Sequence, residues 1–167
     1  GCAAKRVHIL PGVQDIHRVA VVNLSEGTRP SSESEFFTNE FVSVGFAVVE
    51  RGHLQEVIKE AFTQSGFLDE RKVAEWGRGL GVQGVVLHQI LENAAPAPTD
   101  RKRDGEEPRP VCGWVRIVNA ETGEIVLTYN AEVQAPGNGD RVRAAKFYAE
   151  RVVDDIRAAL KERNIRI

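Results

Sequence analysis

The sequence lacks several residues and patterns, and each absence removes a class of protein. Its 167 residues include two cysteines but no C-x-x-C pair and no Cys/His cluster. The four histidines do not have the spacing of zinc ligands, so no metal site is expected; they are His8, His17, His53 and His88. No apolar run approaches the roughly 20 residues of a membrane-spanning helix. The formal net charge of −2 provides no basic field for nucleic acid.

Signatures of catalysis are also missing. The chain contains no G-x-S-x-G, H-E-x-x-H or P-loop pattern. The stretch "WGRGLG" over residues 76–81 is rich in glycine, but it follows a predicted helix and precedes a predicted strand. A phosphate-binding turn has the reverse order, so these glycines are interpreted as a helix end and a tight turn. We therefore predict a protein that is not an enzyme and that uses no cofactor and no small-molecule substrate.

The front of the chain resembles a bacterial lipoprotein. There is no methionine, which predicts that the chain is processed or truncated at its start. Gly1-Cys2 matches the end of a lipobox, in which the cysteine becomes the acylated, diacylglycerol-bearing N-terminus. Ala3-Ala4 carries no inner-membrane retention signal, which favours the outer membrane. Alternatively, Gly1 is a cloning remnant and Cys2 an incidental thiol. The two cysteines could pair in an oxidising periplasm. Cys112 lies in an apolar run, however, and is expected to be a buried single thiol.

The hydrophobic pattern predicts one α/β domain. Residues 1–15 are polar and mixed and are interpreted as a tether, which leaves residues 16–167 for the domain. Strands are expected over 17–24, 46–50, 82–91 and both arms of a hairpin within 111–133. Helices are expected after Ser32, between Arg51 and Ser65, after Asp69 and after Asp140. The Pro-rich, charged segment 93–110 is expected to be an exposed loop. This order predicts a three-layer domain whose mixed sheet of about five strands is covered by helices.

The hairpin has a recognisable turn. Two apolar runs flank Ala120–Gly123, and Gly123 provides the positive φ that a tight turn needs. The turn motif is Thr122, Gly123 and Glu124.

Three motifs together resemble the CsgG-like family, whose best-known member is the outer-membrane lipoprotein channel for curli subunits. They are Val48-Val49-Glu50-Arg51, the stretch from Leu80-Gly81 to Val85-Val86, and Val118-Asn119 followed by the Thr122-Gly123-Glu124 turn. The resemblance covers residues 17–163. The curli channel inserts two membrane hairpins where this chain has 93–110 and 134–139. Neither segment alternates like a membrane strand, so a self-made pore is not expected.

Glu50-Arg51 stands between a strand and a helix, where an acid and a base could act as a catalytic pair or as a brace. The family resemblance implies the brace. A carboxylate near a helix N-terminus meets the positive end of the helix dipole. Arg51 could bridge to a nearby acid or to a neighbouring subunit.

The resemblance implies a non-enzymatic structural component of an envelope secretion or trans-envelope machine. It would be lipid-anchored at the periplasmic face of the outer membrane and would bind protein partners, with homo-oligomers expected. The alternative is a regulatory adaptor like LpoB, a smaller relative that activates a peptidoglycan synthase. A 15-residue tether reaches only about 50 Å, which favours a partner near the outer membrane. The aromatic residues Phe46, Phe67 and Trp114 are candidates for a contact surface.

Overall fold

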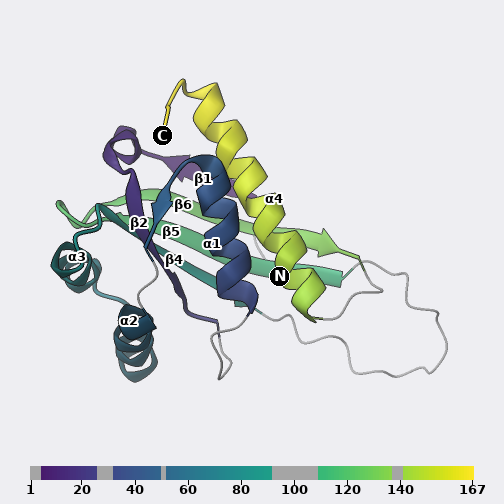
Figure 1. Ribbon diagram of the computed structural model, residues 1–167. Coiled ribbons are helices and arrows are strands. Elements are labelled where there is room, and N and C mark those ends of the chain that lie inside the picture. The colour runs from purple at the N-terminus through teal and green to yellow at the C-terminus, as the bar shows by residue number, and fades with distance from the viewer. Residues whose placement is uncertain (1–4, 26–31, 50–51, 92–108, 137–140) are drawn as a thin grey trace.

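The computed structural model describes residues 5–25, 32–49, 52–91, 109–136 and 141–167 (Figure 1). They form one six-stranded sheet in the order β1-β6-β5-β4-β2-β3. The strands are β1 Arg6–Ile9, β2 Arg18–Asn23, β3 Ala47–Val48, β4 Gly84–Leu91, β5 Arg109–Asn119 and β6 Ile125–Ala135. The helices are η1 Pro11–Asp15, a 3-10 turn, and α1 Ser32–Val44, α2 Gly52–Ser65, α3 Glu70–Gly79 and α4 Arg141–Glu162.

The sheet is mixed, as the sequence predicted. Strand β2 pairs in parallel with both β3 and β4, through the helical crossovers that parallel strands require. Strands β4, β5, β6 and β1 then continue as an antiparallel series, in which β5 and β6 form the predicted hairpin. The α/β fold class is therefore confirmed, with six strands in place of about five.

The additional strand corrects the predicted tether. Residues 6–15 belong to the domain, because β1 pairs with β6 from Arg6↔Asn130 to Ile9↔Leu127 and η1 follows it directly. Ile9 and Val13 are almost completely buried in the core. A strand of four residues is too short to give a clear alternation in the sequence, so its apolar residues did not stand out among their polar neighbours.

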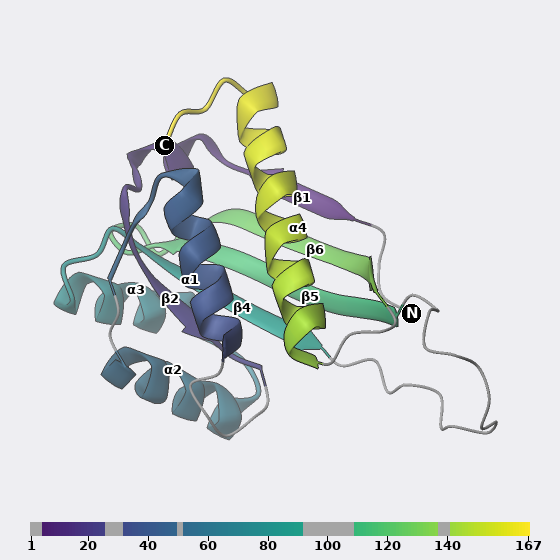
Figure 2. The ribbon, with the colours of Figure 1, turned by 45° about the vertical axis from the view of Figure 1, so that its right-hand side comes forward.

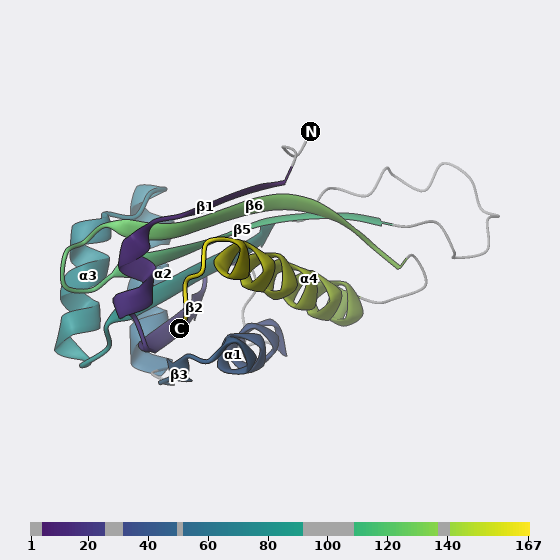
Figure 3. The same ribbon diagram turned by 90° about the horizontal axis from the view of Figure 1, so that it is seen from above.

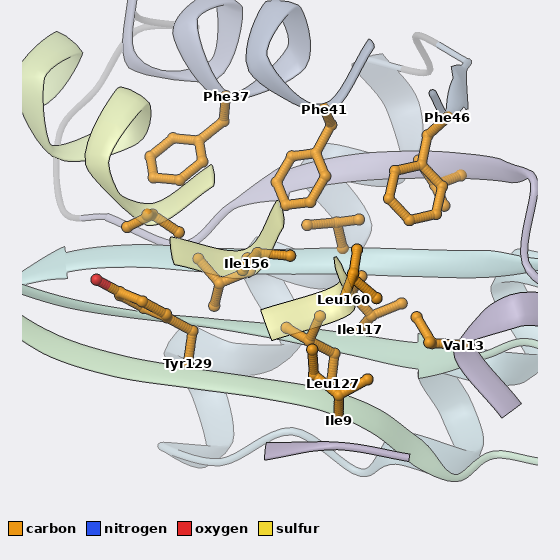
Figure 4. Close-up of a cluster of buried hydrophobic side chains, with 14 of the residues drawn as sticks. Ile9, Val13, Phe37, Phe41, Phe46, Ile117, Leu127, Tyr129, Ile156 and Leu160 are labelled. Carbon is orange, nitrogen blue, oxygen red and sulfur yellow. The ribbon is translucent and has the colours of Figure 1, made fainter. Parts of the chain in front are cut away.

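Helices α1 and α4 cover one face of the sheet and contact each other, and they cross in front of the strands in Figures 1 and 2. Helix α1 contributes Phe37 and Phe41, and α4 contributes Ile156 and Leu160, all directed toward the strands (Figure 4). Glycine is required at position 113 of β5, because a Cβ there would lie 2.7 Å from the Tyr148 hydroxyl of α4. The absent side chain lets α4 approach the sheet.

Helices α2 and α3 pack on the opposite face, which completes the three layers. Leu54 and Ile58 of α2 and Val73 of α3 join the inward residues of β2 and β4 in a second core. Asp69 caps α3 as predicted, since its carboxylate accepts a 3.0 Å hydrogen bond from the Arg71 amide. Seen from above, α1 and α4 lie along the same side of the strands (Figure 3).

Candidate interaction surfaces

The predicted brace, Glu50 and Arg51, lies outside the described residues. The elements on either side of it are where the sequence placed them, with β3 before it and α2 after it. Val49 continues the strand direction, because its amide donates to the Val19 carbonyl at 2.8 Å. The strand-to-helix transition is thus present, while the role of the pair stays a prediction.

The predicted turn over Thr122, Gly123 and Glu124 is a closely bonded element. Gly123 has a φ of +75°, and its amide donates to the Asn119 carbonyl at 2.9 Å. The Asn119 side chain also accepts hydrogen bonds from the amides of Glu121 and Thr122. Arg78 of α3 donates to the Ala120 carbonyl at 2.7 Å, which fixes the turn to α3. These contacts indicate a structural turn.

The three aromatic candidates differ in exposure. Phe46 is buried against Phe41 in the core under α1 and α4, which is the larger of the two cores. Its selection as a surface residue is therefore wrong. Trp114 is half-buried, with its indole N–H donating to Gln89 at 2.9 Å and the Arg116 guanidinium over its ring. Phe67, between α2 and α3, is 67% exposed. An aromatic side chain this exposed costs hydration free energy, which makes Phe67 the best contact candidate of the three.

The structure tests the prediction for one of the two cysteines. Cys2, the predicted site of lipid attachment, lies outside the described residues. Cys112 is buried, as expected, but it is disulfide-bonded, so the expectation of a single thiol is wrong. The apolar context of Cys112 predicted its burial correctly, but burial alone does not determine the state of a sulfur.

A buried polar cluster that the sequence did not reveal lies beneath α1. His88 of β4 is fully buried and stacks on Phe37, with ring centroids 3.9 Å apart. Among the described residues, neither imidazole nitrogen has a hydrogen-bond partner, and the nearby Tyr148 hydroxyl has none either. Burial disfavours the charged imidazolium and lowers the pKa of His88 to about 3. The residue is thus a neutral component of the core.

A second polar cluster joins three elements. Asp155 of α4 is buried and accepts a 2.9 Å hydrogen bond from the Tyr129 hydroxyl of β6. Lys5, directly before β1, pairs with the same carboxylate at 2.8 Å, and Arg151 lies 3.8 Å away. Burial and the hydrogen bond to Asp155 raise the pKa of Tyr129. In the sequence, Asp155 interrupts the apolar stripe of α4, which is the signal that could have identified it.

Within the described ranges, no group of three or more His, Cys, Asp or Glu residues could hold a metal ion. None of the described helices is long and apolar enough to cross a bilayer.

No protein-family model and no curated protein sequence matches the chain, but solved structures do. The PelC dodecamer from Paraburkholderia phytofirmans matches with a TM-score of 0.60 and 14% identity, over 92% of this chain and 96% of that one. Lipoprotein GNA1162 from Neisseria meningitidis matches with a TM-score of 0.51 and 15% identity, over 86% and 99% of the two chains. The fold is shared.

The C-terminal domain of LpoB from Salmonella enterica is also similar, at 19% identity over 71% of this chain and 84% of that one. Its TM-score of 0.43 is too low to support an argument about function. At identities this low, all three matches concern the fold alone. Membership of the CsgG-like family is not shown by them.

Proposed function

We propose that this protein is a non-enzymatic assembly component of the bacterial cell envelope, related to the CsgG-like family. It would be anchored through Cys2 at the periplasmic face of the outer membrane and would form a homo-oligomeric ring. The observation that carries the proposal is the fold shared with PelC, a dodecamer, over 92% of this chain. The Gly1-Cys2 motif and the likeness to lipoprotein GNA1162 support the anchor.

The position of β1 supports assembly close to the membrane. Since β1 begins at Arg6, only three residues separate it from Cys2, and the four steps from Cys2 to Arg6 span about 14 Å at most. The end of β4, the start of β5 and the end of β6 lie at the same end of the sheet as the start of β1. A lipid on Cys2 would therefore hold this end of the domain near the bilayer. Such a short link favours neighbours in the membrane plane over a distant enzyme.

The short edge strands indicate how subunits would meet. Strand β1 has four residues and β3 has two, so neither edge strand offers a long backbone for pairing with another sheet. Side-chain contacts are therefore favoured, and Phe67 is the exposed aromatic residue among those described. In the proposed ring, Phe67 packs against the neighbouring subunit.

Native mass measured on detergent-extracted protein by mass photometry tests the proposal. We expect one multi-subunit species, which Phe67→Ser should dissociate without changing the unfolding midpoint. Val42→Ser is the matched control, because Val42 is 52% exposed on α1, on the other face of the sheet. A monomer of about 18 kDa plus detergent would overturn the ring and favour the regulatory adaptor.

Intact mass tests the anchor separately. The chain has two cysteines, so a disulfide of Cys112 within one chain would use Cys2, and the proposed lipid-anchored form must therefore lack that disulfide. A sulfur that is bonded in a disulfide cannot also carry the thioether of a diacylglycerol. We expect membrane-extracted protein to carry the lipid mass and Cys2→Ser to be released as soluble protein. A chain without lipid, lighter by two hydrogens for a disulfide, would contradict the anchor.

A further inference from the structure

An open-sided cavity of about 540 Å³ lies where α4 ends, between α4, the last residue of α1 and the C-terminal tail. This is the end of α4 near the C-terminus of the chain, as Figure 2 shows. Its volume is within the range of small-molecule sites, and it shares no residue with the proposed subunit contact at Phe67.

The floor of the cavity is aliphatic. It consists of Val44, Leu160, Ile165 and Ile167, all of which belong to the larger core or pack against it. The tail is held there because the Ile165 amide donates to the Leu160 carbonyl at 3.0 Å. Asn164 turns the chain back with a φ of +54°, a conformation that Asn tolerates better than most residues. The floor is therefore built by a specific reversal of the chain.

The rim of the cavity is cationic. Arg157 is held in place by two hydrogen bonds of 2.9 Å, to the Asp154 carboxylate and to the Ser43 hydroxyl. Lys161 and Arg166 also line the cavity, and neither forms an ion pair with a described residue. Among the described lining residues no side chain is a carboxylate. Because Arg157 is paired with Asp154, the positive charge that the cavity presents beside its apolar surface comes from Lys161 and Arg166.

The helix dipole does not account for this arrangement. A basic residue in the last turn of a helix stabilises its negative end, and Lys161 alone would do so. Arg166 lies beyond the helix, and the carbonyls of Leu160 and Lys161 already accept backbone hydrogen bonds. These bonds form a Schellman cap, which accounts for the apolar pair Leu160 and Ile165, but Val44 and Ile167 take no part in it. We propose that the cavity binds an amphipathic anion, a carboxylate or phosphate head on a short aliphatic body.

Methyl NMR of the full chain labelled at Ile, Leu and Val tests the site with three probes of equal chain length: octanoate, octyl phosphate and octan-1-ol. We expect saturable shifts confined to the floor methyls of Val44, Leu160, Ile165 and Ile167 with at least one anion. The two anions distinguish a carboxylate from a phosphate ligand. The neutral alcohol should bind at least tenfold more weakly, because it lacks the charge that the rim recognises.

The variant Lys161→Gln/Arg166→Gln should weaken binding of the preferred anion by about tenfold, in line with two partly exposed ion pairs. Lys72→Gln on the exposed side of α3 is the matched control and should bind like the unaltered protein. Both altered positions are exposed, so an unchanged amide spectrum elsewhere will establish that the double variant is folded. Anions that shift no floor methyl, or that bind the double variant equally well, would overturn the proposal. Neither result bears on the native mass.

Discussion

The two faces of the sheet are built differently. Among the described residues, the face under α1 and α4 has twenty that are buried and apolar, and five of these are aromatic. The face under α2 and α3 has eleven, none of them aromatic. The aromatic residues of the second face, such as Phe62 and Trp76, lie at its margin and are only partly buried.

The larger core also contains the polar atoms without partners. His88 and Tyr148 both belong to the face under α1 and α4, and Asp155 and Tyr129 form their hydrogen bond at its edge. Unpaired buried polar atoms destabilise a core, so this face must offset their cost by close packing. The face under α2 and α3 is smaller but has no such cost among its described residues. The larger core thus contains buried polar atoms without partners, whereas the described part of the smaller core does not.

The largest expected difference between the faces comes from a matched pair of isoleucines. Ile156 of α4 and Ile58 of α2 are both fully buried, one on each face. We expect Ile156→Ala to lower the free energy of unfolding by about 4 kcal/mol and Ile58→Ala by about 2 kcal/mol. The cavity that Ile156→Ala would create is surrounded by fully buried neighbours. Helix α2, in contrast, has partly buried residues on its inner side and can shift to fill the space that Ile58→Ala would leave. Urea denaturation measures both values.

Equal losses for the two alanine variants would mean that α2 is held as rigidly as α4. A larger loss for Ile58→Ala would reverse the comparison. The denaturant slope of each variant should match that of the unaltered protein, since a changed slope would mean that the unfolded state differs too.

An intermediate effect on stability is expected from pH, through His88 on the face under α1 and α4. The folded protein keeps the pKa of His88 near 3, whereas the unfolded chain takes up this proton near pH 6.5. The stability that comes from neutral His88 is therefore fully present above pH 6.5. It falls by about 1.4 kcal/mol per pH unit as the pH drops toward 3. When the pH falls from 7 to 5, we expect the free energy of unfolding of His88→Leu to decrease by about 2 kcal/mol less than that of the unaltered protein. Urea denaturation at the two pH values measures this.

His8 provides the control for this pH effect, because it is an exposed histidine on β1. The variant His8→Leu should keep the pH dependence of the unaltered protein. Parallel curves for His88→Leu and the unaltered protein would mean that the imidazole finds a proton acceptor or water in solution.

The sequence predicted the regular elements that have long periodic patterns. Helix α4 shows its apolar stripe over several turns, and the β5–β6 hairpin is marked by Gly123 between two apolar runs, so both could be recognised locally. Strand β1 could not be recognised, because four residues are too few and its partner β6 lies more than a hundred positions later. The mixed sheet followed from the order of elements, but its sixth strand depended on this distant pairing.

Side-chain environments were harder to predict than elements. Phe46 was selected as a surface residue, although the residue is buried, because an aromatic side chain beside a glycine gives no local sign of its surroundings. His88 stacks on Phe37 of α1, and Tyr148 of α4 lies against Gly113 of β5, so both environments depend on contacts between distant parts of the chain. Asp155 did carry a signal, since a carboxylate within an apolar stripe requires a partner.

The smallest expected effects compare two tyrosines within the larger core. Tyr129→Phe removes a hydrogen bond to the buried Asp155, while Tyr148→Phe removes a hydroxyl that has no partner. We expect the first to cost about 1.5 kcal/mol and the second to stabilise the fold by about 0.5 kcal/mol, because an unpaired buried hydroxyl is itself destabilising. Thermal unfolding at pH 7 should therefore shift the two midpoints in opposite directions. A loss of stability in Tyr148→Phe would show that its hydroxyl is bonded in solution, and the larger core would then be less costly than its unpaired polar atoms indicate.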